Sequence, residues 1–275
     1  MSGTLTLPDG ARMAFTDSGA RDDALPLVML HAFPLHRGMW ASQLAACGLV
    51  RRCIAPDLRG FGESTLGDGP VTMDQMARDV VALLDHLAIE RAAIAGLSMG
   101  GYVAFGIVRQ HPERVGALIL ADTRAAADGE EARMKRADLI ALARAEGSEA
   151  VAERQLPGLL GKTTRAQRPD LVEATRRMLE SASVEAIVAG AEALRDRPDS
   201  TTLLESIAVP TLVICGAEDT VTQPREMREM AERIPGSRFV LLEEAGHLSN
   251  VEQSDRFDEA VTEFLDEIGK GHPAT

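Results

Sequence analysis

The chain has 275 residues and is 45% hydrophobic, which is enough to bury a large core in one α/β domain. Its formal net charge of −13 argues against nucleic acid or an anionic membrane as a partner, and no apolar run approaches the length of a membrane span. The N-terminal residues lack the pattern of a signal peptide and the three cysteines lack paired spacing, so we expect a cytoplasmic protein.

Short apolar runs alternate with helical patterns through the first half of the chain. Residues 5–7 and 13–15 flank the turn Pro8-Asp9-Gly10 and predict a hairpin. Residues 73–87 place their apolar side chains on one stripe, as in an amphipathic helix. Further strands are predicted near Leu27, Ile54, Ala93 and Leu118. This alternation predicts a mostly parallel, doubly wound sheet.

The alternation stops between Arg124 and about Asp199. This region is rich in Ala, Arg and Glu, and its helical periods are separated by Gly147, Pro157-Gly158, Pro169 and Pro198. We expect a cap of helices that roofs the site, although a helical excursion without a role in substrate selection is the alternative. We therefore predict a first core segment at residues 1–123, a cap at 124–199, a second core segment at 200–268 and a frayed tail at 269–275.

The strand at residues 93–97 ends in Gly96-Leu97-Ser98-Met99-Gly100 and passes directly into a helical pattern. A Gly-x-Ser-x-Gly turn between a strand and a helix needs positions without side chains, and it exposes the serine hydroxyl. The bare motif is weak, and a glycine-rich connector with an idle serine is the alternative. Its position between strand and helix makes Ser98 the candidate nucleophile.

Two later strands each end just before a candidate partner for Ser98. Asp219 follows the apolar run at 209–215, and His247 follows the run at 238–242. The carboxyl ends of parallel strands share one edge of a sheet, so the three side chains can meet there. His247 would take the serine proton and Asp219 would hold the imidazole. Glu218 and Asp122 are alternative acids, the latter because it also follows a predicted strand.

An attacked acyl carbonyl also needs two N–H donors for the oxyanion that forms. One would be the amide of Met99, at the start of a helix, where the dipole favours negative charge. The other would be the amide of Phe33, in the loop His31-Ala32-Phe33-Pro34 after the strand at Leu27. The alternative is a turn imposed by Pro34 in which Phe33 only packs.

Four segments together resemble the α/β-hydrolase fold superfamily, in particular its cap-bearing esterases, lactonases and haloperoxidase-like members. They are His31-Ala32-Phe33-Pro34, Asp57-Leu58-Arg59-Gly60-Phe61-Gly62-Glu63-Ser64, the turn Gly96 to Gly101, and Gly246-His247. The resemblance implies an eight-stranded, mostly parallel sheet with the cap inserted after the sixth strand. Ala32 departs from the glycine common in the family. A narrower resemblance, over residues 246–253, is to 3-oxoadipate enol-lactonases.

The residues that would line the substrate pocket are harder to predict. Few aromatic residues are present, so a modest apolar pocket for a small acyl group is expected. If the enol-lactonase resemblance holds, Arg124 would meet the anionic end of the substrate, although a solvated arginine is the alternative. The candidates are Phe33, Trp40, Met99, Tyr102 and Arg124 from the core, and Leu142, Leu156, Leu159 and Leu160 from the cap.

The sequence thus predicts a serine hydrolase that cleaves a small carboxylic ester or lactone through an acyl-enzyme. No cofactor is expected, and no metal site, because the histidines lack ligand spacing. The alternatives are an enol-lactonase, a cofactor-free perhydrolase or haloperoxidase, a carbon–carbon bond hydrolase, and a small-molecule sensor with slow turnover. Fold alone does not choose among them, and the sequence indicates no oligomeric state.

Overall fold

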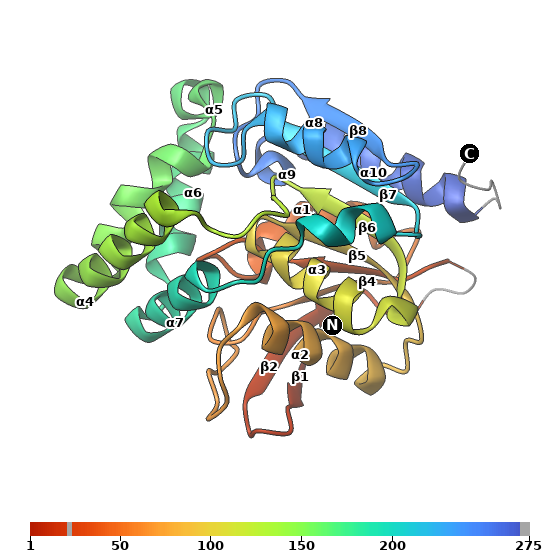
Figure 1. The fold of residues 1–275 in the computed structure, drawn as a ribbon, viewed down its shortest axis with the longest axis horizontal. Helices are drawn as coiled ribbons and strands as arrows, with labels where there is room; N and C mark the ends of the chain where they lie inside the picture. The colour runs from red at the N-terminus through yellow and green to blue at the C-terminus, as the bar shows by residue number, and fades with distance from the viewer. Residues whose placement is uncertain (21–23, 270–275) are drawn as a thin grey trace.

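An eight-stranded sheet lies at the centre of the computed structural model, which describes residues 1–20 and 24–269 (Figure 1). The strand order is β1-β2-β4-β3-β5-β6-β7-β8. β2 is antiparallel to both of its neighbours, and the other pairs are parallel, so the predicted mostly parallel sheet is confirmed. The strands are β1 (Ser2–Thr6), β2 (Arg12–Asp17), β3 (Leu27–Leu30), β4 (Cys53–Pro56), β5 (Ala92–Leu97), β6 (Val115–Ala121), β7 (Thr211–Gly216) and β8 (Arg238–Leu242).

Helices cover both faces of this sheet. One face packs against α2 (Met73–His86), α3 (Met99–Gln110) and α8 (Pro224–Glu232), and the other against α1 (Ala41–Cys47) and α10 (Ser254–Gly269). Every residue of β5 is therefore buried, because a parallel strand between two helical layers has no solvent-facing side. Short helices link these elements: η1 (Arg37–Trp40), η2 (Pro112–Arg114), η3 (Thr201–Ser206) and α9 (Ser249–Glu252).

The helix α2 shows how local sequence sets these boundaries. Thr72 precedes it in an extended conformation, and its hydroxyl accepts a hydrogen bond from the Gln75 amide, which caps the first turn. Met76, Val80 and Leu84 then recur every four residues and are buried on one face. The predicted amphipathic helix over 73–87 is confirmed to within one residue.

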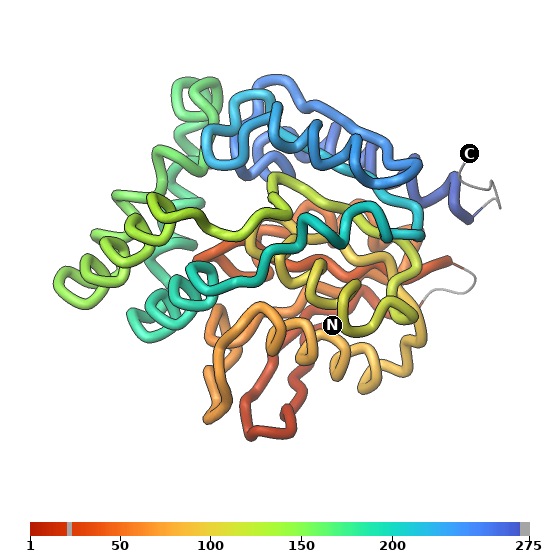
Figure 2. Tube along the Cα trace, in the orientation of Figure 1, coloured from red at the N-terminus to blue at the C-terminus, as the bar shows by residue number. Residues whose placement is uncertain are grey.

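Four helices between β6 and β7 form a separate layer, here called the helical insert. They are α4 (Glu130–Leu159), α5 (Lys162–Gln167), α6 (Pro169–Glu180) and α7 (Val184–Arg195). Figures 1 and 2 show the chain leaving the sheet after β6, building this layer beside the strand ends, and returning before β7. Gly147 has a φ of 85° and bends α4, whereas α4 continues through Pro157, where we expected a break.

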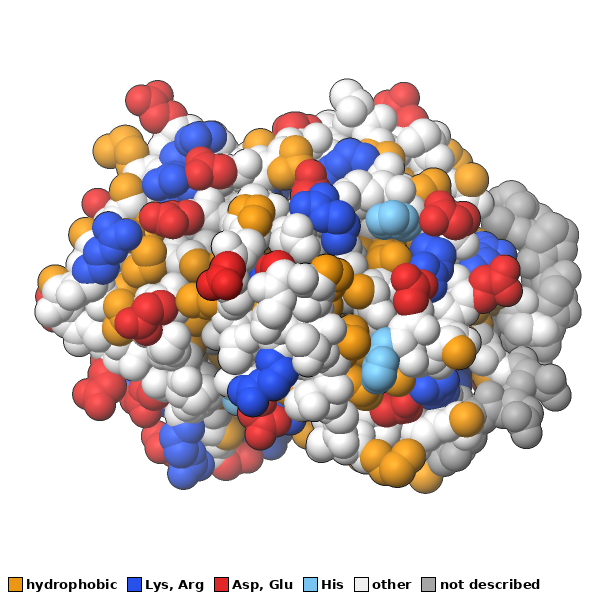
Figure 3. Space-filling model, turned by 90° about the horizontal axis from the view of Figure 1, so that it is seen from below, with side chains coloured by type: hydrophobic (Ala, Val, Ile, Leu, Met, Phe, Trp, Pro, Cys, Tyr) orange, Lys and Arg blue, Asp and Glu red, His pale blue; other side chains and the backbone are white. Residues whose placement is uncertain are grey.

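Charged side chains of both signs are interspersed over the face seen in Figure 3. Among the described residues, no helix combines the length and the apolarity needed to cross a membrane. Cys47, Cys53 and Cys215 are free and buried, as expected of small apolar side chains in a core. The predicted tail, apart from Gly269, lies outside the described residues.

Candidate active site

Ser98 stands on a sharp turn between β5 and α3. Its φ of 54° and ψ of −112° are sparsely populated for any residue with a side chain. Two glycines make the turn possible: an added Cβ at Gly96 would lie 2.3 Å from the carbonyl oxygen of Gly100. An added Cβ at Gly100 would lie 2.1 Å from the carbonyl oxygen of Leu30. The turn therefore fixes Ser98 at the carboxyl edge of the sheet, partly exposed.

A continuous hydrogen-bond relay joins the three side chains predicted from the strand ends. The Ser98 Oγ lies 2.8 Å from His247 Nε2, and His247 Nδ1 lies 2.8 Å from Asp219 Oδ2. His247 and Asp219 are almost fully buried, at 1% and 3% exposure. A proton on Nδ1 is held by the carboxylate, which leaves Nε2 free to accept the Ser98 proton.

The carboxylate of Asp219 is fixed by its own loop. Its Oδ1 accepts hydrogen bonds from the amides of Val221 at 2.7 Å and Thr222 at 3.0 Å, and the Thr222 hydroxyl donates to Oδ2. Burial alone would raise the pKa of Asp219, but the adjacent His247 and these hydrogen bonds hold that pKa below its usual value. Asp219 is therefore a fixed anion beside the imidazole.

The two alternative acids are occupied elsewhere. Asp122 Oδ1 accepts the Gly216 amide at 2.8 Å, and its Oδ2 accepts the hydroxyl of Ser249. Burial, followed by the nearby charge of Asp219, raises the pKa of Asp122 well above its usual value. Glu218 instead accepts hydrogen bonds from the amide and hydroxyl of Thr163 in the helical insert. The geometry favours Asp219 as the partner of His247.

The candidate oxyanion donors lie at the ends of the neighbouring strands β3 and β5, whose registers pair Leu30 with Gly96. Within the described residues, neither the Phe33 amide nor the Met99 amide is hydrogen-bonded. The loop that carries Phe33 is anchored by His31, whose Nε2 accepts a hydrogen bond from the Leu58 amide at 2.8 Å. Burial lowers the pKa of His31 to about 4, so this histidine is uncharged at neutral pH and has a structural role.

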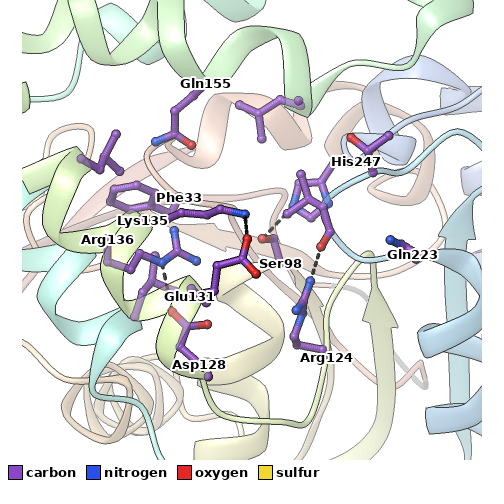
Figure 4. Close-up of a pocket in the computed structure, with 18 of the residues that line it drawn as sticks. Phe33, Ser98, Arg124, Asp128, Glu131, Lys135, Arg136, Gln155, Gln223 and His247 are labelled. Atoms are coloured by element: carbon purple, nitrogen blue, oxygen red, sulfur yellow. Dashed lines mark hydrogen bonds and ion pairs between the residues drawn. The ribbon is translucent and has the colours of Figure 1, made fainter.

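A cavity of about 830 Å³ opens over Ser98 and His247. Its apolar wall contains Phe33, Leu139, Leu159 and Leu194. Three of the expected pocket residues, Tyr102, Arg124 and Leu159, also line the cavity. Arg124, however, donates to the carbonyl oxygen of Val221 and lies 3.7 Å from Glu226, so its charge is already compensated (Figure 4).

Trp40, Leu142 and Leu156, which we expected in the pocket, are not among the residues of the cavity wall. Trp40 is fully buried with its ring centre 6.0 Å from that of Phe257 in α10. Leu142 packs against the hydrophobic cluster that includes α2 and α3, and Leu156 belongs to the cluster that includes α1 and α10. The side chains of Met99 and Leu160 are likewise buried away from the cavity.

The roof of the cavity carries polar residues that the sequence did not single out. Lys135 lies 2.7 Å from Glu131, and Arg136 lies 3.2 Å from Asp128, so these charges pair within the insert (Figure 4). Gln155, on α4 after the bend, also lines the cavity. No motif marks these positions, since polar side chains on a helix usually face solvent.

Two buried or half-buried carboxylates fasten the insert to the loops that carry Asp219 and His247. Glu252 accepts the amides of Gly161 at 2.8 Å and Gly246 at 2.9 Å, and burial raises its pKa. Glu218, next to Asp219, binds Thr163 as described above. The insert is thus joined to both loops at the start of α5.

Comparison with known proteins places this architecture in a family. The model of the α/β hydrolase fold matches residues 26–254. The chain belongs to the α/β-hydrolase fold family. It is similar over 258 residues to 3-oxoadipate enol-lactonase 2 of Acinetobacter baylyi, with 34% identity and 94% of each chain covered.

Solved structures of other α/β hydrolases superimpose closely on this one. A thermophilic esterase from Thermogutta terrifontis, solved with malate bound, has 40% identity and a TM-score of 0.92, with 98% of this chain and 99% of the other covered. The enol-lactonase from Burkholderia xenovorans has 32% identity and a TM-score of 0.88, with 96% and 100% covered. These relatives support a hydrolase of the ester- or lactone-cleaving type.

One group of potential metal ligands lies within this α/β-hydrolase site. Asp122, Cys215 and Asp219 bring ligand atoms within 4.8 Å of one another. Both carboxylates are already engaged by the hydrogen bonds described above, and burial raises the pKa of the Cys215 thiol, which disfavours the thiolate that metals bind. This donor set does not fit a metal ion.

Proposed function

We propose that the protein is a serine hydrolase that cleaves a small carboxylic ester or lactone through an acyl-enzyme. The observation that carries this proposal is the relay from Ser98 through His247 to Asp219, with both contacts at 2.8 Å. The esterase and enol-lactonase names of the relatives support the same bond type. The cytoplasm remains the proposed compartment.

In this proposal Ser98 Oγ attacks the acyl carbon while its proton passes to His247 Nε2. Asp219 stabilises the imidazolium, and the amides of Phe33 and Met99 donate to the oxyanion. The tetrahedral intermediate then expels the alcohol, which takes the proton from His247. A water molecule, deprotonated by the same histidine, attacks the acyl-enzyme, and His247 then returns the proton to Ser98 Oγ as the acid leaves. The scheme uses no metal and no organic cofactor.

We also propose that residues 124–199 act as a cap between core segments 1–123 and 200–268. Leu139, Leu159 and Leu194 of the insert face the cavity that Ser98 opens into. Such a roof excludes bulk water from the reacting bond and restricts the shape of the acyl group. A small neutral substrate suits this mixed, largely ion-paired lining.

Replacement of the proposed nucleophile tests the assignment directly. Ser98→Ala is expected to lower kcat for p-nitrophenyl butyrate by about 10⁴-fold or more, since no acyl-enzyme can form. The measurement is release of p-nitrophenolate, with the thermal midpoint of unfolding as a control for the fold. Unchanged turnover in this variant would refute the proposal. Ligand-induced stabilisation without turnover of any ester, lactone or thioester by the unmodified protein would instead favour a sensor.

A second candidate function is hydrolysis of 3-oxoadipate enol-lactone, favoured by the enol-lactonases described above among the relatives. Arg124 is the proposed contact for the anionic end, but its present partners, Val221 and Glu226, would have to release it. Assay of this lactone with the unmodified protein and with Arg124→Gln tests the idea. A selective rise in KM for the lactone supports it, and equal KM values contradict it.

A further inference from the structure

Gln155 is a cavity residue whose side-chain amide nitrogen has no hydrogen-bond partner among the described residues. Its Nε2 is shielded from solvent and finds no hydrogen-bond acceptor among the described residues. A buried amide without a partner is destabilising by an amount comparable to a lost hydrogen bond, so such a group calls for an explanation. Leu159 follows Gln155 by one helical turn and lies on the same helix face. Both residues line the cavity.

The surroundings of Gln155 make this amide distinctive. The cavity wall includes the apolar residues Phe33, Leu139 and Leu159, and its cations Lys135 and Arg136 pair with Glu131 and Asp128. Figure 4 shows Gln155 projecting from α4 into the cavity, on the same side of Ser98 as Phe33. Gln155 therefore places a neutral amide at the cavity wall, with its Nε2 shielded from solvent in the present rotamer.

We propose that Gln155 is a specificity-determining residue that donates a hydrogen bond from Nε2 to a carbonyl oxygen on the acyl chain of the substrate. A turn about the terminal torsion of glutamine, which has a broad energy profile, aims the NH₂ group at a bound acyl chain. The substrate class is then an oxo-substituted ester or lactone. This inference rests on the proposed function and adds the acyl group that the site selects.

Sites built to bond a polar group discriminate strongly against analogues that lack it, because the protein group is then left buried and unpaired. Matched esters isolate this effect: p-nitrophenyl 4-oxopentanoate and 5-oxohexanoate against pentanoate and hexanoate. In each pair a CH₂ becomes C=O with little change of shape. The unmodified protein is expected to prefer at least one oxo ester by about fivefold or more in kcat/KM.

Two variants separate the hydrogen bond from the shape of the side chain. Gln155→Leu removes the donor, and Gln155→Glu keeps the shape but replaces the donor with an acceptor. Both are expected to lose most of the oxo preference relative to the unmodified protein. Comparing each ratio with that of the unmodified protein cancels the intrinsic reactivity of the oxo esters.

The matched control is Gln167→Leu, the same chemical change at an exposed position of the insert outside the cavity wall. It is expected to leave the oxo preference unchanged. Equal preference in the unmodified protein and in both Gln155 variants, with Ser98-dependent turnover intact, would overturn the role of Gln155 alone.

A failure of the proposed function would look different, because no ester would then be hydrolysed at all. In that case calorimetry with methyl 4-oxopentanoate and methyl pentanoate still tests Gln155. Tighter binding of the oxo ester that is lost in Gln155→Leu supports the inference, and equal binding of the two esters refutes it.

Discussion

Asp122 and Asp219 are buried carboxylates that follow neighbouring strands, yet their contacts give them opposite electrostatic roles. Asp219 faces His247 Nδ1 at 2.8 Å, and its pKa stays below the usual value. Asp122 faces the Gly216 amide and the Ser249 hydroxyl, and burial raises its pKa. Asp122 therefore joins the end of β7 to α9, whereas Asp219 supports the imidazole.

A pair of isosteric substitutions separates these roles. Asp219→Asn is expected to lower kcat for p-nitrophenyl butyrate by about 10³-fold or more, because an amide disfavours the imidazole tautomer that accepts the serine proton. Asp122→Asn keeps both contacts, since its oxygen accepts the Gly216 amide and its NH₂ donates to Ser249. Its kcat should stay within about threefold. The reverse ranking of the two variants would make Asp122 the catalytic acid.

The raised pKa of Asp122 also predicts a pH-dependent stability. In the unfolded chain this carboxyl ionises near 3.8, whereas in the folded protein it does so only at higher pH, so folding loses stability as the pH rises above about 4 through the raised pKa. Asp122→Asn lacks that ionisation. The thermal midpoint of Asp122→Asn minus that of the unmodified protein should therefore increase by about 2 °C or more from pH 4.5 to pH 9. A difference that does not vary with pH would contradict this.

The residues that sequence reasoning located best are those with a local geometric signature. Ser98 is marked by the two flanking glycines that its turn requires, and His247 by its place after a late strand. Asp122 and Asp219 could not be separated in this way, because both follow strands that end at one sheet edge. Trp40 and Leu156 were expected in the pocket but lie in a core cluster, because periodicity reveals an apolar face but not what covers it.

At the scale of elements, the link between the insert and the catalytic loops depends on Glu252 and Glu218. Glu252 receives two backbone N–H groups, one on each oxygen, and neither donor can be reversed. Glu218 receives one amide and one hydroxyl from Thr163, and a hydroxyl can also accept. The same change of carboxylate to amide should therefore have unequal consequences at these two positions.

Glu252→Gln should leave one buried amide, that of Gly161 or Gly246, facing an NH₂ group. We expect a loss of about 1–3 kcal/mol in the free energy of unfolding and a fall of about tenfold in kcat/KM, since Gly246 precedes His247. Urea denaturation and ester hydrolysis at pH 8 measure both. Glu218→Gln is the matched control and should change stability by less than about 0.5 kcal/mol, because its oxygen can accept the Thr163 amide while its NH₂ donates to the Thr163 hydroxyl. Equal losses in the two variants would contradict this account.

The strands and helices of the core could be predicted from the sequence because the spacing of apolar residues differs between a strand and a helix. The hairpin, α2 and the parallel strands all lie where the alternation of apolar runs predicted them. The insert could not be resolved in the same detail. Gly147 bends α4 through its positive φ, whereas Pro157 is accommodated near the helix end, and a sequence does not rank these two helix breakers.

At the scale of the whole molecule, the formal charge of −13 acts on any charged ligand that approaches the cavity. The cavity lining itself pairs much of its charge, as Lys135 with Glu131 and Arg136 with Asp128 illustrate. The long-range field is therefore set by the protein as a whole rather than by the cavity wall.

This field predicts how salt affects the turnover of anionic esters. At about 0.01 M ionic strength the screening length is about 30 Å, so an anionic ester is repelled during approach. The kcat/KM for mono-p-nitrophenyl glutarate is expected to rise about two- to threefold between 10 mM and 500 mM NaCl. Neutral p-nitrophenyl pentanoate is the control and should change little. A fall with salt for the anionic ester would reveal a cationic site that outweighs the net charge.

The adjacency of β3 and β5 has a consequence for how the proposed oxyanion site can be altered. Its two amides follow strands paired at Leu30 and Gly96, so the ladder repeat of about 4.8 Å, rather than any side chain, sets the width between them. Side-chain replacement at Phe33 or Met99 then reports on fit and packing. Removing either donor requires editing the main chain itself, for instance by exchanging one peptide link for an ester through semisynthesis.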